Sequence, residues 1–102
     1  MQTISPANLK ERMDSGEHLN IVDVREPDEH AASNIGGQSV PLGKIMSMQA
    51  DELDDLKDEE IICYCRSGKR SMQACLMLET IGFTNVKSLE GGITAYLDAY
   101  PS

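Results

Sequence analysis

Two short and nearly continuous apolar segments, residues 19–24 and 60–65, constrain the fold more than any other feature of the sequence. A third apolar segment covers residues 85–89, and residues 39–41 form a shorter stub of the same kind. Strands without an exposed polar face are typical of parallel sheets, because helices cover both faces of such sheets. Since parallel neighbours require crossover connections, we expect an α/β domain with a mainly parallel sheet.

Helix signals lie between these apolar segments. The strongest covers residues 69–81, where Ala74, Met77, Leu78 and Ile81 repeat at helical spacing and Gly82 follows as a stop. Near the start of the chain, Ser5 and Pro6 are typical of an N-cap and a first helical position. The predicted helices other than 69–81 are residues 6–15, residues 29–32, one or two short helices within 42–56, and residues 93–100.

The length and charge of the chain limit its organisation and its partners. A chain of 102 residues is expected to form one domain, residues 1–102. The formal net charge of -8 opposes binding to nucleic acid and to anionic lipid, so neither partner is expected. No segment is long enough to span a bilayer and the amino terminus does not resemble an export signal, which predicts a cytoplasmic protein. The acidic residues of segment 51–60 are interpreted as a solvated face, with a docking surface as the alternative.

The chain has three cysteines, Cys63, Cys65 and Cys75. On one strand, the first two would point to the same face with Cα atoms ~6.6 Å apart, whereas a disulfide needs Cβ atoms about 3.5–4.5 Å apart. At least one thiol is therefore expected to be free. Cys63 lies within an apolar strand and Cys75 on the apolar face of the next helix, so both are interpreted as core residues.

Cys65 differs from the other cysteines because it ends a predicted strand just before a loop and a helix. Ligands of open α/β sheets bind at this place, where the amide groups of the helix start are unpaired. A tight turn at Gly68 would form an anion-binding nest, and Arg66, Lys69 and Arg70 add positive charge. The pKa of a cysteine in such a setting falls from about 8.5 towards roughly 3.5–7.5. Cys65 is thus predicted to be a nucleophile.

Two other motif interpretations fail on spacing. A phosphate-binding P-loop would need glycine at position 63 and serine or threonine at position 70, which hold Cys63 and Arg70. A zinc site would need cysteines or histidines at ligand spacing, but His18 and His30 lie far from each other and from the cysteines. Both histidines are interpreted as surface residues, and no metal is predicted.

Residues 65–71, with the sequence Cys-Arg-Ser-Gly-Lys-Arg-Ser, match the rhodanese active-site motif Cys-Arg-Ser-Gly-x-Arg-Ser. The chain resembles the rhodanese family over nearly its whole length, since residues 21–26, 34–41, 82–83 and 89–92 also resemble segments of that family. The resemblance implies a three-layer α/β fold with a central, mainly parallel sheet of about five strands flanked by helices. Two residues depart from the family pattern outside the active loop: Asn34 replaces a histidine and Tyr96 a tryptophan.

The resemblance implies a sulfurtransferase in which Cys65 takes sulfur from thiosulfate or a persulfide donor. The resulting persulfide would pass sulfur to cyanide, a small thiol or a redox-protein acceptor, without a cofactor. Arg66 and Lys69 would orient the dianionic donor, and the backbone amides of residues 67–71 would hold the persulfide. Arg70 would act electrostatically or pin the loop. The resemblance thus assigns Cys65 as catalytic and, as substrate-binding residues, Arg66, Ser67, Gly68, Lys69, Arg70 and Ser71.

Two residues outside the loop and two other functions need a separate interpretation. Asp23 and Arg25 are expected to form an ion-pair or hydrogen-bond network beneath the end of the sheet rather than to act in catalysis. A related phosphatase or arsenate reductase would need arginine six positions after the cysteine, where this chain has Ser71. A sulfur carrier or regulatory module that barely turns over thiosulfate would use the same loop, so the sequence leaves that alternative open.

Overall fold

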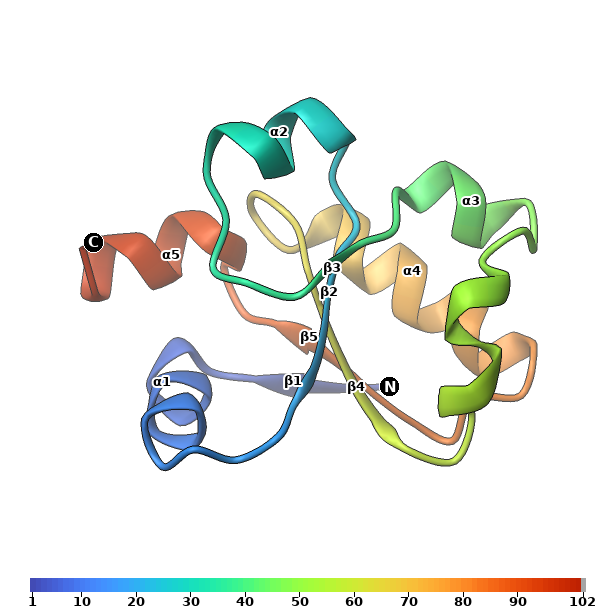
Figure 1. Ribbon diagram of the computed structural model, residues 1–102, viewed down its shortest axis with the longest axis horizontal. Helices are drawn as coiled ribbons and strands as arrows, with labels where there is room; N and C mark the ends of the chain where they lie inside the picture. The colour runs from blue at the N-terminus through green and yellow to red at the C-terminus, as the bar shows by residue number, and fades with distance from the viewer. Residues whose placement is uncertain (102) are drawn as a thin grey trace.

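The sheet of the computed structural model, which describes residues 1–101, has five strands in the order β1-β5-β4-β2-β3 (Figure 1). Every neighbouring pair is parallel. This arrangement confirms the predicted mainly parallel sheet of about five strands. The strands are β1 (Gln2–Ile4), β2 (Asn20–Asp23), β3 (Gln38–Ser39), β4 (Glu60–Tyr64) and β5 (Asn85–Leu89).

The helices pack on both faces of this sheet, which gives the predicted three layers (Figure 1). They are α1 (Pro6–Asp14), α2 (Pro27–Ala32), α3 (Leu42–Met46), the 3₁₀-helix η1 (Asp51–Leu56), α4 (Lys69–Thr80) and α5 (Gly92–Ala99). Helices α1 and α5 cover one face, and α3, η1 and α4 cover the other. Helix α2 follows the carboxyl end of β2 and lies beyond the sheet. Each helix in residues 1–101 is too short or too polar to traverse a bilayer.

The central strand β4 explains why its sequence is apolar without interruption. Ile61 and Cys63, together with Cys65 just beyond the strand, pack in the cluster under α4, while Ile62 and Tyr64 pack in the cluster under α1 and α5. All five are at most 1% exposed. A strand with helices on both faces must be apolar at both alternating positions. The three cysteines are all free and buried, as expected for Cys63 and Cys75.

The start of the chain combines a confirmed prediction with a missed strand. Ser5 caps α1, because its hydroxyl accepts a hydrogen bond from the Asn8 amide at 3.1 Å, and Pro6 is the first helical residue. Strand β1 was not predicted: only Ile4 of its three residues is buried, so the segment has no strand periodicity. It forms because its backbone pairs with β5, from the far end of the chain, in register Ile4 with Leu89.

The acidic segment follows its predicted behaviour up to residue 59. Its carboxylates at positions 51, 52, 54, 55, 58 and 59 are exposed, whereas Leu53 is buried. Glu60 differs, since its carboxylate is partly buried at the start of β4 and pairs with Arg12 and Lys87. The segment therefore ends in a partly buried ion network.

Candidate active site

The loop after β4 is shaped by its contact with the start of α5. The amide of Ile93 donates to the carbonyl oxygen of Cys65 at 2.8 Å, and that of Thr94 donates to the carbonyl of Arg66 at 3.1 Å. In a planar trans peptide the N–H points opposite to the carbonyl. Since the two carbonyls face α5, the amides of Arg66 and Ser67 are directed away from α5. The free amides at the start of one helix thereby orient the loop that precedes another.

This contact requires glycine at position 92. A Cβ atom there would lie 2.5 Å from the carbonyl oxygens of both Cys65 and Arg66, and the φ of Gly92 is +63°. Any side chain would push α5 away from the loop. The sequence predicts only a turn at Gly91 and Gly92. Their role in positioning the loop depends on contacts with residues far away in the chain.

The sulfur of Cys65 lies inside the loop among hydrogen-bond donors. The Gly68 amide donates to Sγ at 3.0 Å, and Ser71 Oγ lies 3.6 Å from Sγ. Burial raises the pKa of the thiol, but the hydroxyl of Ser71 and the backbone amides of Ser71, Gly68 and Ser67 stabilise the anion more strongly, so the pKa is lowered. The thiolate is stabilised by these local dipoles, whereas the sequence predicts a contribution from three basic side chains as well.

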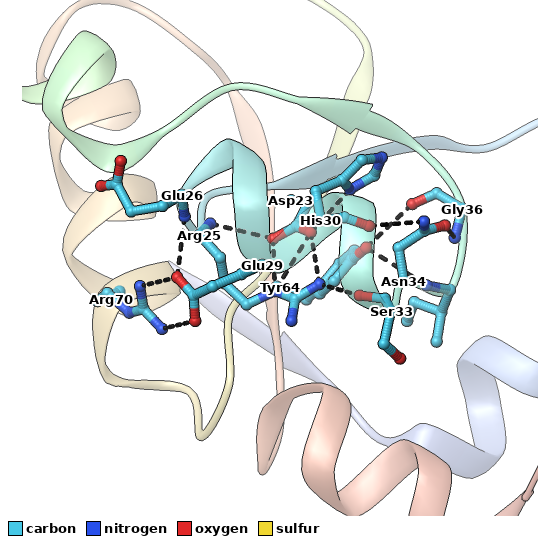
Figure 2. Close-up of polar contacts among 11 residues, drawn as sticks. Asp23, Arg25, Glu26, Glu29, His30, Ser33, Asn34, Gly36, Tyr64 and Arg70 are labelled. Carbon is cyan, nitrogen blue, oxygen red and sulfur yellow. Dashed lines mark hydrogen bonds and ion pairs between the residues drawn. The ribbon is translucent and has the colours of Figure 1, made fainter.

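The three basic side chains of the loop have different surroundings. Arg70 forms a two-pronged ion pair with Glu29 of α2, at 2.9 and 3.1 Å, which joins α4 to α2 (Figure 2). Hydrogen bonds from Arg70 and from the Glu26 backbone amide lower the pKa of Glu29 to about 2. Two roles were left open for Arg70, an electrostatic one and that of pinning the loop. The ion pair with Glu29 matches the second role.

Arg66 and Lys69 are exposed and line different cavities. Arg66 borders a cavity of about 280 Å³ between α2 and α5, together with Arg25 and Thr94. Lys69 borders one of about 270 Å³ beside β1 and β5, together with Glu90. Neither side chain forms an ion pair within residues 1–101. The sequence predicts that both residues act on one donor, and in the structure they line different cavities.

Asp23 and Arg25 form the expected network at the end of β2. The Asp23 carboxylate accepts hydrogen bonds from Arg25 Nε at 3.0 Å and Nη2 at 2.8 Å, and lies 2.8 Å from His30 Nδ1 (Figure 2). Burial raises the pKa of Asp23, but the hydrogen bonds from Arg25 and His30 outweigh it and the pKa is lowered. His30, interpreted as a surface residue, is instead partly buried. Arg25 also donates to the Ser33 carbonyl at 2.6 Å, which holds the end of α2.

The two departures from the family pattern have structural partners. The Asn34 side chain donates to the His30 carbonyl at 2.9 Å and accepts from the Gly36 amide at 2.9 Å, so it closes the turn after α2. Tyr96 packs in the core under α5, with its hydroxyl 3.7 Å from the sulfur of Met13.

Ser88 on β5 is a polar residue near the site that the sequence analysis did not single out. It is 1% exposed, and its Oγ lies 2.7 Å from Ser71 Oγ. The available signal was a serine within a segment that was predicted to be a buried strand. Within residues 1–101, no group of three His, Cys, Asp or Glu side chains is placed to hold a metal ion.

The model of the rhodanese-like domain matches residues 5–99. A sulfurtransferase of Allochromatium vinosum is 35% identical over 94 residues, covering 91% of this chain and 85% of the relative. The human thiosulfate:glutathione sulfurtransferase is 27% identical over 108 residues, covering 94% of this chain and 93% of the relative. The solved structure of the human single-domain sulfurtransferase TSTD1 superposes with a TM-score of 0.79 at 25% identity and covers 96% of both chains. With its fold, its loop and these similarities, the chain belongs to the rhodanese-like domain family of sulfurtransferases.

Proposed function

We propose that this protein transfers sulfane sulfur from thiosulfate, or from a persulfide donor, to a thiol or cyanide through a persulfide on Cys65. The observation that carries the proposal is the buried Cys65 sulfur, which faces amide and hydroxyl donors at the carboxyl end of the central strand. These donors suit an anion on sulfur, and both the thiolate and the persulfide are such anions. We propose a small thiol or a redox protein as the physiological acceptor.

The reaction divides into two displacements at sulfur, as expected for covalent catalysis. First, the Cys65 thiolate attacks the outer sulfur of thiosulfate. A new S–S bond forms, the old one breaks, and sulfite leaves with the bonding electron pair. Second, the acceptor thiolate attacks the outer sulfur of the persulfide, and the Cys65 thiolate leaves with its electron pair. No net oxidation of the protein occurs, and the lowered pKa of Cys65 favours the thiolate that attacks in the first step and leaves in the second.

The cavity between α2 and α5 supports an anionic donor. Arg66 lines it with an exposed guanidinium that has no ion-pair partner within residues 1–101, and Arg25, which is paired with Asp23, lines it as well. A doubly charged anion is attracted there although the whole protein is acidic. The similarity to a human relative named for thiosulfate and glutathione agrees with this choice of donor and with a thiol acceptor.

The position of Arg70 argues against a phosphatase. A phosphatase of related fold needs an arginine that folds over the bound oxyanion, six residues after the cysteine. Here that position is Ser71, whose hydroxyl is buried against Ser88, and Arg70 is held by Glu29. Neither residue is free to surround a phosphoryl group.

Mass spectrometry of the intact protein tests the proposal. After incubation with thiosulfate and removal of excess reagent, the wild-type chain is expected to gain one sulfur atom and to lose it when cyanide is added. Cys65→Ser should gain none, while Cys75→Ala, a buried cysteine on α4, should behave like the wild type. The proposal is wrong if the wild type gains no sulfur from thiosulfate or from a persulfidated donor protein, or if Cys65→Ser gains it as well.

The amount of sulfite released distinguishes an enzyme from a sulfur carrier. An enzyme releases sulfite over many turnovers when thiosulfate and a thiol acceptor are both present. A carrier accepts sulfur mainly from a persulfidated protein and releases little sulfite from thiosulfate. We expect multiple turnover, because Arg66 leaves an exposed positive charge in the cavity beside the loop.

A further inference from the structure

Two buried serine hydroxyls follow one another in space behind the reactive sulfur, first that of Ser71 and then that of Ser88. Ser71, in the first turn of α4, is 0% exposed and Ser88, on β5, is 1% exposed. Their Oγ atoms are 2.7 Å apart, and Ser71 Oγ is 3.6 Å from Cys65 Sγ. The three side chains form a row of hydrogen-bonding atoms between β5 and β4 that is shielded from solvent.

The single proton of the Ser71 hydroxyl has three neighbours that can accept it. These are the Gly68 carbonyl at 3.1 Å, Ser88 Oγ at 2.7 Å and Cys65 Sγ at 3.6 Å. A hydroxyl donates one hydrogen bond and can accept two. While Cys65 is a neutral thiol, its S–H can donate to Ser71 Oγ, and the Ser71 proton can go to the Gly68 carbonyl. When the sulfur is an anion it can only accept, so the Ser71 proton must turn towards it.

Ser88 completes the hydrogen bonding of the state in which the sulfur is an anion. Within residues 1–101, the hydrogen-bond partner found for its hydroxyl is Ser71 Oγ. When Ser71 donates to an anionic sulfur, its oxygen no longer receives the thiol proton, and Ser88 can donate to it instead. Both buried hydroxyls then remain paired, and the donation from Ser88 polarises the Ser71 O–H towards the sulfur.

We propose that Ser88 is a positioning residue whose hydroxyl donates to Ser71 and thereby directs the Ser71 proton to the Cys65 sulfur whenever that sulfur is an anion. For the thiolate, the inference stands on the hydrogen-bond geometry alone. For the persulfide, it also rests on the proposed function. Ser88 acts through Ser71 and does not touch the sulfur itself.

Several charged or titratable groups belong to the elements packed around the loop. They come from the loop, from α2 and α4, and from the strands on either side: Arg66, Lys69, Arg70, Glu29, Cys63, Cys75 and Glu90. A substitution at Ser88 leaves all of them in place. A pair of variants that differ only in the hydroxyl at position 88 therefore isolates its effect.

Ser88→Val and Ser88→Thr form such a pair, because they have the same shape and both suit a strand. Ser88 borders the cavity of about 270 Å³. The measurement is the alkylation rate of Cys65 by iodoacetamide against pH, followed by mass spectrometry of the Cys65 peptide. Ser88→Val is expected to shift the profile to higher pH and to slow alkylation below its midpoint by about threefold to tenfold. Ser88→Thr should keep the wild-type profile.

A double substitution tests the route through Ser71. In a Ser71→Ala background, Ser88→Val should cause no further shift, because the hydroxyl that it orients is gone. A wild-type profile for Ser88→Val, equal shifts for Val and Thr, or an additive shift in the Ser71→Ala background would each overturn the proposal. Ser88→Ala gives the same comparison if the valine variant does not fold. Alkylation needs no sulfur donor, so this result is independent of the thiosulfate experiment.

Discussion

Cys65 owes its reactivity to hydrogen bonds from its immediate surroundings. Burial alone would raise the pKa of its thiol, as it does for the neighbouring Cys63, whose pKa is raised by the Cys75 thiol and by burial. The two cysteines lie one residue apart, and both are buried. The difference is that the chain turns around Cys65 and presents amides to it, whereas Cys63 lies within β4 among apolar side chains. Two cysteines that are both buried therefore have opposite pKa shifts.

Neutral substitutions of the two exposed cations of the loop should have unequal effects. Arg66 lines the cavity that also contains Arg25, whereas Lys69 lines the other cavity, beside Glu90. If thiosulfate enters beside Arg66, Arg66→Gln should raise its KM by about tenfold, the loss of one charge-assisted hydrogen bond. Lys69→Gln should raise it by about threefold or less, since its charge lies near a carboxylate. Steady-state kinetics would contradict this if Lys69→Gln had the larger effect.

At the scale of secondary structure, the site consists of one strand end and the starts of two helices. Strand β4 ends before Cys65, α4 begins after Gly68, and the first amides of α5 bind the loop carbonyls. The orphan amides of a helix start normally bind water or capping side chains. Here those of α5 bind the loop, and those at the start of α4 surround the sulfur. The rigidity of the site comes from these backbone contacts.

Alanine substitutions at two glycines should separate steric overlap from backbone strain. Gly92→Ala places a Cβ atom 2.5 Å from the loop carbonyls, so we expect it to lower the free energy of unfolding by roughly 3–5 kcal/mol. In Gly68→Ala the nearest atom would be 3.7 Å away, and only its φ of +108° is unfavourable, at a cost of about 1–2 kcal/mol.

Urea unfolding measures both effects, and the alkylation rate of Cys65 reports on the loop. Gly92→Ala should slow alkylation at neutral pH, because the displaced carbonyls no longer direct the amides towards the sulfur. Equal losses of stability in the two variants would show that the close approach of α5 to the loop does not matter.

Across the whole molecule, an excess of acidic groups is partly offset by a partly buried ion network at the amino ends of the strands. Glu60 accepts hydrogen bonds from Arg12, at 3.0 Å from Nη1 to Oε2, and pairs with Lys87. Arg12 also pairs with the more exposed Glu17. The hydrogen bond from Arg12 outweighs burial and lowers the pKa of Glu60 to about 2, from an ordinary value of 4.5. The network joins α1 to β4 and β5 at the end of the sheet opposite the site.

The lowered pKa of Glu60 predicts how stability depends on pH. Between about pH 4.5 and pH 2 the unfolded chain binds a proton at this residue that the folded chain does not. The stabilisation is therefore present above pH 4.5 and is lost as the pH falls through that range. Glu60→Gln should remove on the order of 2 kcal/mol at neutral pH and flatten this part of the acid unfolding curve.

Glu17→Gln is the matched control, since Glu17 shares the Arg12 partner but is more exposed. Its effect on the unfolding free energy is expected to be smaller than that of Glu60→Gln, because solvent screens an exposed ion pair. Chemical denaturation at several pH values measures both variants. If both lost the same stability at neutral pH, the burial of Glu60 would have no energetic consequence.

The sequence alone determined the features that depend on local pattern. Apolar runs buried on both faces predicted β2, β4 and β5, and residues such as Ser5 and Gly82 predicted where helices begin and end. It also placed Cys65 beyond a strand end, before a glycine turn. These inferences were possible because strand burial, helix caps and turns are set by residues that are close together in the chain.

Only the tertiary structure decided which groups meet at the site. Strand β1 exists because of its pairing with β5, Arg70 pairs with Glu29, and Ser88 reaches Ser71. These contacts join segments between 17 and 87 residues apart, as for Ser71 with Ser88 and for Thr3 with Glu90. Local propensity carries no information on such pairings, because they form only when the sheet order brings the segments together. For that reason, the sequence located the reactive sulfur, while the fold determined which donors stabilise it.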